Sequence, residues 1–288
     1  MINNTIPFVV QPLGGLANRM RVVSVCRDIA REARVRMQVC WVTDGGMGAK
    51  WEELFEKPDF DITAEGAPRE IYYCSKRWYR RLPVLKYQLQ NGFDRFLPAP
   101  VADDLLDRDE QHPETFCRML VSWLRKGKRV YLSTGSYLGL PRDLSMFRPL
   151  PEIDSAAHHY ADEHRFAEGH TYGLHIRRTD NTWAIEQSPL TLFEEQINSI
   201  ISKDNTALFY LASDDKTTIE QLRQTFGERI LVREKTFGRS SVTGIQDALT
   251  DMLLLSKTQH IFGSFFSSFS EMASWMGSVP LTILKSAK

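Results

Sequence analysis

The fold prediction starts from one stretch, Tyr172-Gly173-Leu174-His175-Ile176-Arg177-Arg178-Thr179-Asp180. Its first five residues form a short, largely apolar run, which is typical of a β-strand. Two arginines and an acidic residue follow directly, at the point where such a strand ends. Ligands of open α/β sheets bind beyond the carboxyl ends of the strands. The stretch therefore predicts a strand that leads into a ligand-binding loop.

Around this stretch, the second half of the chain alternates apolar strands with amphipathic helices. Strands are expected at residues 207–212, 230–232, 261–263 and 281–284, and helices at 189–200, 219–226, 245–255 and 268–276. Strands that alternate with helices predict a parallel sheet with helices on its faces. We therefore expect the second half to form one α/β domain of the Rossmann type.

The N-terminal half opens with the same alternation. A strand is expected at residues 8–10, a glycine turn at Gly14-Gly15, a helix at 16–33 and a strand at 35–41. This order is a βαβ unit, which implies a second parallel sheet. Two prolines within residues 148–152 favour a break in regular structure. We predict an α/β fold with two Rossmann-type domains, residues 1–152 and 153–288, and a central cleft between them.

The overall composition excludes some classes of partner. The 288 residues carry 36 Lys and Arg against 36 Asp and Glu, so the formal net charge is zero. Such a balance argues against a nucleic-acid backbone or an anionic membrane as the main partner. No apolar run reaches the length of a transmembrane segment, no signal-peptide pattern is found, and four scattered cysteines indicate reduced thiols. These features predict a cytoplasmic protein with no nucleic-acid partner and no transmembrane segment.

The sequence also lacks a convincing metal-binding pattern. Cysteine and histidine do not cluster with the spacing of zinc sites. Asp107-Arg108-Asp109 is an Asp-x-Asp string, but it stands in a polar stretch between expected helices, which favours a solvated loop. We therefore expect no metal cofactor.

The arginine stretch favours an anion site. The planar guanidinium groups of Arg177 and Arg178 match the geometry of phosphate oxygens. A guanidinium fixed beside a departing diphosphate stabilises the charge that develops in the transition state, and Asp180 is suited to hold one arginine in place. The alternative is a surface cluster of ion pairs at a strand-to-loop junction. The chemistry of the residues alone leaves both interpretations open.

Three further clusters lie at expected strand ends or on one helix face. Asp214 and Asp215 follow a strand, a position at which acidic side chains bind ribose hydroxyls or base N–H groups. The alternative is that one of them caps the next helix. Asp247 and Asp251 share one face of a helix, where two like charges are unfavourable unless a ligand binds them. The alternative is that this face is simply solvated. Residues 263–270 combine glycine and serine before a helix, which suits an anion site and N-capping alike.

The order and spacing of these clusters resemble the GDP-fucose-dependent fucosyltransferases, the group that contains the α1,2-, α1,6- (including nodulation) and protein O-fucosyltransferases. The best match is His175-x-Arg177-Arg178-x-Asp180. Further matches are residues 211–215, residues 251–256, Ser267-Ser268-Phe269 and Gly14-Gly15-Leu16-Ala17-Asn18. The likeness extends over about residues 172–276, is local at the N-terminus, and does not include residues 45–170.

The resemblance implies a GT-B architecture, an inverting reaction and no metal requirement. It assigns donor contacts to His175 and Arg177, with Arg177 on the β-phosphate, and guanine recognition to Asp251. Further donor-binding residues that it suggests are Gly15, Asn18, Arg178, Asp214, Ser267, Ser268 and Phe269. Within this set, the serines and Phe269 face the diphosphate, and Gly15 and Asn18 face the sugar and the acceptor.

No catalytic base follows directly from the resemblance. Glu186 lies after the arginine motif, where some family members have an acidic residue, and Asp180 is the other candidate. Two positions depart from the family pattern, because Asn181 stands where a lysine is frequent and Ala17 where a glycine is usual. These departures concern the acceptor side more than the donor side.

We therefore expect a glycosyltransferase that transfers fucose from GDP-fucose to a hydroxyl of a glycan or glycoconjugate. The N-terminal domain is assigned to the acceptor and the C-terminal domain to the GDP-sugar. A bacterial cytosolic enzyme that acts on a glycan or a lipid-linked intermediate is the accompanying hypothesis. Three alternatives stay open: a non-catalytic sugar-nucleotide-binding protein, a glycosyltransferase that uses another nucleotide sugar, and an interaction scaffold that binds no nucleotide.

Overall fold

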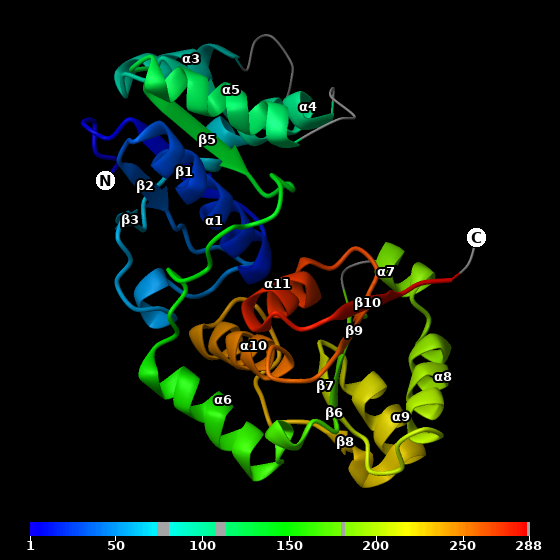
Figure 1. Ribbon diagram of the computed structural model, residues 1–288. Helices are drawn as coiled ribbons and strands as arrows, with labels where there is room; N and C mark the ends of the chain where they lie inside the picture. Colours follow the sequence, from blue (N-terminus) through cyan, green and yellow to red (C-terminus); the bar gives the residue numbers. More distant parts are fainter. Residues whose placement is uncertain (74–80, 108–112, 180–181, 287–288) are drawn as a thin grey trace. The chain divides into compact units, whose positions relative to one another are not determined.

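The computed structural model describes residues 1–73, 81–107, 113–179 and 182–286. The chain forms two compact units, residues 1–148 and 149–288 (Figure 1). The division falls between Arg148 and Pro149, whereas the sequence predicted a boundary after Glu152, which lies in the first turn of α6 (Pro151–Glu163). Each unit is built on a five-stranded parallel sheet, so the predicted α/β class with two Rossmann-type units is confirmed.

Unit 1 has the strand order β3-β2-β1-β5-β4, and all pairings are parallel. Its strands are β1 (Phe8–Pro12), β2 (Met37–Cys40), β3 (Asp61–Thr63), β4 (Arg95–Leu97) and β5 (Val130–Thr134). Its α-helices are α1 (Leu16–Ala33), α2 (Arg69–Tyr72), α3 (Arg81–Gln90), α4 (Ala99–Asp107) and α5 (Pro113–Arg125), with a 3₁₀ turn at Trp51–Glu53. The central strands β1 and β5 are buried along their whole length.

The glycine turn sets the start of α1. Gly14 has a φ of +83°, in the left-handed region that favours glycine, and Gly15 is the N-cap residue. The helix ends at Arg34, which also adopts the left-handed conformation and returns its backbone N–H to Ala30 and Arg31. Because β1 and β2 pair in parallel on either side of this helix in the sequence, the predicted βαβ unit is confirmed.

The middle of unit 1 contains regular structure that the sequence did not reveal. Residues 45–128 include β3, β4 and the helices α2 to α5. The clearest missed signal is α5, whose buried residues Phe116, Leu120, Val121 and Leu124 follow helical spacing. Asp107 is the last residue of α4 rather than part of a loop, and Arg108 and Asp109 lie outside the described residues.

Unit 2 has the strand order β10-β9-β6-β7-β8, again parallel throughout. Its strands are β6 (Thr171–Ile176), β7 (Leu208–Ser213), β8 (Ile230–Leu231), β9 (Ile261–Ser264) and β10 (Leu281–Leu284). After α6 come the α-helices α7 (Thr182–Gln187), α8 (Leu190–Ile201), α9 (Lys216–Phe226), α10 (Val242–Leu255) and α11 (Ser268–Gly277), and 3₁₀ turns lie at Phe166–Glu168 and Gly227–Arg229. Residues 172–176 therefore lie in the central strand β6, and residues 177–179 lie in the loop that follows it.

Two glycines allow helices to approach the central strands. A Cβ on Gly173 in β6 would lie 2.9 Å from side-chain atoms of Leu255 and Thr258, at the end of α10. A Cβ on Gly263 in β9 would lie 2.5 Å from the hydroxyl oxygen of Ser270 in α11. Both distances are shorter than any ordinary contact, so a larger residue would push these helices away. Close packing of α11 places the start of this helix beside the ends of β6 and β9.

Candidate functional site

Three loops of unit 2 meet at one edge of its sheet. They follow β9, β6 and β7, which are neighbours in the sheet and point the same way. The loops carry Phe265 to Ser267, Arg177 to Thr179, and Asp214 with Asp215. The parallel register therefore collects most of the sequence-predicted donor residues at the carboxyl edge, where α/β sheets bind ligands.

Asp214 holds the arginine loop in place. One of its carboxylate oxygens accepts a hydrogen bond from the backbone N–H of Arg178 at 2.7 Å, and the other accepts from the hydroxyl of Thr179 at 2.7 Å. Its neighbour Asp215 caps α9, because its carboxylate accepts from the backbone N–H and the hydroxyl of Thr218. The capping interpretation thus holds for Asp215, whereas Asp214 supports the loop that carries both arginines.

Ser264 joins this loop to the neighbouring strand. The backbone N–H of Arg177 donates to the Ser264 hydroxyl at 3.1 Å, and that hydroxyl donates to the carbonyl of His175 at 3.3 Å. A second serine, Ser188, accepts from the backbone N–H of Phe265 at 2.8 Å and donates to the carbonyl of Leu284. Ser264 belongs to residues 263–270, which suit an anion site, but these hydrogen bonds of Ser264 and Ser188 could not be predicted, because the partners lie 77 or more positions away along the chain.

His175 is buried against an aromatic ring. Its imidazole stacks on Phe269, with ring centroids 4.8 Å apart and an interplanar angle of 23°. The pKa of His175 is lowered to about 3, mainly by burial. The Asp214 carboxylate opposes this effect, and the charges of Arg177, Lys235 and Arg239 add to it. The imidazole is therefore neutral at physiological pH, so that it can donate one hydrogen bond and accept another.

Three buried polar atoms of this edge make no hydrogen bond within the part of the chain that the structure describes. They are Nδ1 of His175, Nη2 of Arg178 and Oγ of Ser267. A buried polar atom without a partner costs about 1–3 kcal/mol, and such atoms are rare in folded proteins. Three of them at one sheet edge indicate a place built for a polar ligand.

The start of α11 adds positive potential to the same place. Ser267 occupies the N-cap position, but its side chain makes no capping hydrogen bond, so the predicted capping role of this hydroxyl is not realised. The first backbone N–H groups of a helix and its dipole favour a negatively charged group. Ser268 is the first residue of the helix, and Phe269 follows beneath the imidazole of His175. Together these groups form a site whose chemistry suits a phosphate.

Asp251 lies in a buried polar network beside β7. It is 4% exposed, and its two oxygens accept from the hydroxyl of Tyr210 at 2.7 Å and from the ammonium group of Lys235 at 2.5 Å. Arg233 pairs with Asp247 at 2.8 Å and lies 3.8 Å from Asp251. The like charges that the sequence placed on one helix face are thus neutralised by residues of the same unit. Guanine recognition by Asp251 stays a prediction, and in this structure the two oxygens of its carboxylate are engaged by Tyr210 and Lys235.

Of the two candidate bases, only Glu186 lies in the described part of the chain, and it is not part of this network. Glu186 lies on α7 with an exposed side chain. Asp180 and Asn181 lie outside the described residues. Within the described ranges, no group of three or more histidine, cysteine or acidic side chains has the arrangement of a metal site.

Gly15, the N-cap of α1, and Asn18, in its first turn, belong to unit 1, where a buried arginine of the same helix binds the preceding glycine turn. Arg19 is 1% exposed, and its guanidinium donates to the carbonyl of Gly14 at 2.7 Å and to the carboxylate of Asp44 at 2.6 Å, as well as to the carbonyl of Val42. Burial lowers the pKa of Arg19, and the Asp44 carboxylate opposes this effect. Sequence analysis did not single out Arg19, although it follows Asn18 directly.

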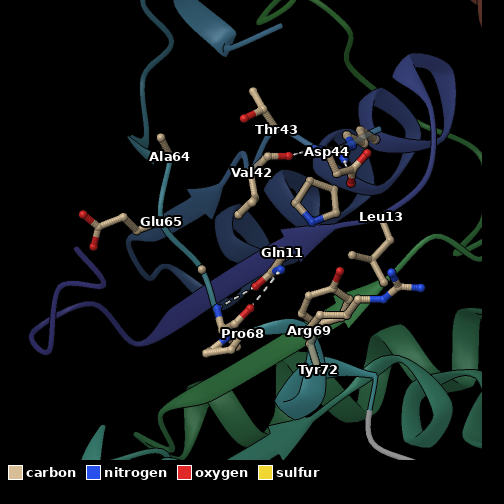
Figure 2. Close-up of a pocket in the computed structure, with 14 residues that line it drawn as sticks. Gln11, Leu13, Val42, Thr43, Asp44, Ala64, Glu65, Pro68, Arg69 and Tyr72 are labelled. Atoms are coloured by element: carbon tan, nitrogen blue, oxygen red, sulfur yellow. Dashed lines mark hydrogen bonds and ion pairs between the residues drawn. The ribbon is translucent and has the colours of Figure 1, made fainter. Parts of the chain in front are cut away.

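The same unit has a pocket of about 470 Å³ at the carboxyl ends of β1, β2 and β3 (Figure 2). Gln11 closes its base, since its side chain bonds to the backbone of Ala67 in both directions. Asp44 and Glu65 contribute carboxylates, and Tyr72 and Arg69 contribute a ring and a guanidinium. The remaining lining residues are Pro12, Leu13, Arg19, Val42, Thr43, Ala64, Gly66, Ala67 and Pro68. Pockets of this volume accommodate ligands of small-molecule size.

No α-helix in the described parts of the chain combines the length and the apolar character needed to cross a membrane.

Comparisons with solved structures identify the fold. The chain is similar to the NodZ α-1,6-fucosyltransferase co-crystallised with GDP, at 15% identity and a TM-score of 0.57 over 93% of this chain and 92% of that one. It is similar to a variant of Arabidopsis thaliana FUT1 in complex with GDP, at 17% identity and a TM-score of 0.60 over 98% and 71%. It is similar to POFUT1 in complex with GDP, at 13% identity and a TM-score of 0.55 over 98% and 99%. No protein-family model and no curated protein sequence matches the chain.

These likenesses concern architecture, because the identities are low. They extend over nearly the whole chain, including residues 45–170, in which no sequence resemblance was found. The predicted likeness to the GDP-fucose-dependent fucosyltransferases is therefore confirmed at the level of the fold: this chain has their GT-B architecture.

Proposed function

We propose that the chain is a glycosyltransferase that transfers fucose from GDP-fucose to a hydroxyl group of a glycan or glycoconjugate. The observation that carries the proposal is the set of three unbonded polar atoms, His175 Nδ1, Arg178 Nη2 and Ser267 Oγ, around the start of α11. A diphosphate supplies both the negative charge and the acceptor oxygens that this set lacks. The fold likeness supports the choice of donor, since NodZ and POFUT1 have been crystallised with GDP or GDP-fucose.

The reaction is a single displacement at the anomeric carbon of the donor sugar. The acceptor oxygen forms its bond to this carbon from the face opposite GDP, while the bond to the β-phosphate oxygen breaks and GDP leaves. Inversion follows from this geometry. Arg177 and the start of α11 stabilise the negative charge that grows on the departing β-phosphate, and neutral His175 donates a hydrogen bond to it. We propose that these groups perform this task without a metal ion.

The proton of the acceptor hydroxyl goes to a carboxylate, for which Glu186 and Asp180 are the proposed candidates. Asp214 is unsuited to this role, because both of its oxygens are engaged in holding the arginine loop. Glu186 is exposed to solvent on α7, the helix that follows this loop. A binding protein without turnover is the second candidate, and it is favoured by the engagement of the Asp214 and Asp251 carboxylates in hydrogen bonds within unit 2.

Titration calorimetry with GDP, UDP and ADP tests the donor assignment. We expect GDP to bind and UDP and ADP to bind at least ten-fold more weakly. Preferential binding of UDP would contradict a GDP-sugar donor, and no binding of any nucleotide would indicate a scaffold. Release of GDP from GDP-fucose in the presence of hydroxyl acceptors then separates the enzyme from the binding protein, because only an enzyme turns over.

We further propose that unit 1 binds the acceptor and that its pocket holds one sugar of it. The pocket supports this assignment because it combines carboxylates for hydroxyl groups with the ring of Tyr72 for the apolar face of a sugar. Tyr72→Ala is expected to raise the KM for a glycan acceptor about ten-fold and to leave the affinity for GDP unchanged. Acceptor titrations at saturating GDP-fucose measure the effect, and an unchanged KM would place the acceptor elsewhere. Tyr73→Ala is the matched control, because Tyr73 is exposed and does not line the pocket.

A further inference from the structure

Three aromatic side chains gather beside the candidate phosphate site of unit 2. The rings of Trp183 and Phe266 lie 5.7 Å apart, those of Trp183 and Phe265 lie 5.8 Å apart, and both pairs meet edge to face. Trp183 is 55% exposed and Phe266 is 69% exposed. Large aromatic side chains are usually buried for the free energy that burial provides. A cluster held together at the surface is therefore a candidate contact surface for a ligand.

The backbone at Phe266 is strained to produce this arrangement. Its φ is +54°, in the left-handed region that a bulky side chain rarely adopts. The strain cannot be explained by burial of the ring, since most of the ring faces solvent. The loop is anchored on one side by the Phe265 N–H donating to Ser188 and on the other by the start of α11. Local strain that the surroundings maintain is a feature of ligand-binding sites.

The order of strands gives the position of this cluster relative to a bound nucleotide sugar. The network of Asp251 lies beside β7, and the three unbonded polar atoms lie at the ends of β6 and β9. In the aromatic cluster, Phe265 and Phe266 follow β9 and Trp183 lies in α7. The ammonium group of Lys285, just past β10, lies 5.9 Å from the centre of the ring of Phe265. Figure 1 shows α7 beside β9 and β10, at the side of the sheet away from β8.

This order matches the chemical order of the proposed donor. A GDP-sugar runs from base to ribose to diphosphate to sugar. If the diphosphate lies at the ends of β6 and β9 and the base lies toward β7, the sugar falls on the far side of β9. The groups found there are Trp183, Phe265 and Phe266, and the two phenylalanines have no hydrogen-bonding atoms in their side chains.

We propose that Trp183 and Phe266 form the subsite for the transferred sugar and select a 6-deoxy sugar by contact with its methyl group. This inference rests on the proposed function and names the feature of the donor that the site recognises. Aromatic rings offer a methyl group an apolar surface. A hydroxymethyl group in the same place loses hydration without gaining a hydrogen-bond partner from the phenylalanines. A difference of one hydroxyl group against an apolar surface gives a discrimination of roughly 10- to 100-fold.

The test compares two donors that differ at one position. GDP-L-galactose is GDP-L-fucose with a hydroxyl group added to the methyl carbon. Calorimetry gives the dissociation constants of both compounds and of GDP for the full chain and its variants. For the parent chain we expect GDP-L-fucose to bind roughly 10- to 100-fold more tightly than GDP-L-galactose. In Trp183→Ala and Phe266→Ala this ratio is expected to fall to about three-fold or less, with the affinity for GDP unchanged.

Two further variants give results that could contradict the inference: one removes both the ring and the backbone strain, and the other is a control in unit 1. Phe266→Gly removes the ring and relieves the left-handed strain, so its Tm is expected to rise while the discrimination falls. Leu89→Ala removes an exposed apolar side chain from unit 1 and is expected to leave the ratio unchanged. If Phe266→Gly and Trp183→Ala both bind GDP and keep the full preference for GDP-L-fucose over GDP-L-galactose, the methyl subsite is overturned and the proposed function is not. If the parent chain does not bind GDP, the proposed function is overturned as well.

Discussion

Arg177→Ala is expected to lower kcat/KM for transfer from GDP-fucose by about 10²- to 10³-fold. The guanidinium is proposed to neutralise the β-phosphate as the bond to the sugar breaks, so its effect is largest in the transition state. The variant is expected to fold normally, because the loop is held by backbone contacts: the N–H of Arg177 bonds to Ser264 and that of Arg178 to Asp214. Neither contact involves the side chain that is removed.

The measurement is the rate of GDP release from GDP-fucose, together with the affinity for GDP. Arg177→Lys keeps the charge and loses the planar fork, so an intermediate loss is expected. Arg223→Ala is the matched control, since Arg223 is exposed on α9 and belongs to neither site. If Arg177→Ala retains a rate within two-fold of the parent chain, Arg177 does not stabilise the leaving group. A loss equal to that in Arg223→Ala would lead to the same conclusion.

The strand pattern of unit 2 could be predicted because its signals are local. Apolar runs of three to six residues, separated by amphipathic helices, specify a parallel sheet without any knowledge of long-range contacts. The positions of Arg177, Asp214 and Ser267 at strand ends follow from the same pattern, since parallel strands bring their carboxyl ends to one edge. Helices were expected on either side of residues 107–109, but their bounds could not be given because no single segment of residues 45–128 dominated the pattern, although α5 has clear helical spacing.

The environment of each site residue could not be predicted, because it depends on contacts between distant segments. Ser264 and Ser188 act through partners at least 77 positions away. The left-handed conformation of Phe266 has no sequence signal, since that conformation normally indicates glycine. N-capping was one of the two roles that suited residues 263–270, and Ser267 stands at the N-cap position, but its hydroxyl makes no capping hydrogen bond to the helix. The environment of Asp251 was the hardest to predict from the sequence, because its partner Lys235 comes from the loop between β8 and α10.

Asp251→Ala is expected to destabilise the protein by about 3–5 kcal/mol. The side chains of Asp251 and Lys235 are 6% and 8% exposed, so removal of the carboxylate leaves a buried ammonium group without its partner. Tyr210 loses the acceptor of its hydroxyl in the same variant. Chemical denaturation monitored by circular dichroism gives the free energy of unfolding. Asp247→Ala is the control and is expected to cost less, because that carboxylate is 16% exposed.

The loss of stability and the predicted recognition of guanine can be separated with a double variant. Replacing both partners, in Asp251→Leu with Lys235→Leu, removes the unpaired charge and is expected to recover most of the stability. If Asp251 recognises guanine, this folded double variant still loses the preference for GDP over ADP, because the N–H groups of the base have no carboxylate to bind. If Asp251 serves only to neutralise Lys235, the preference returns together with the stability. Calorimetry with GDP and ADP distinguishes the two results. In the first case, the base and the ammonium group of Lys235 compete for the oxygens of Asp251, so Lys235→Met is expected to tighten GDP binding.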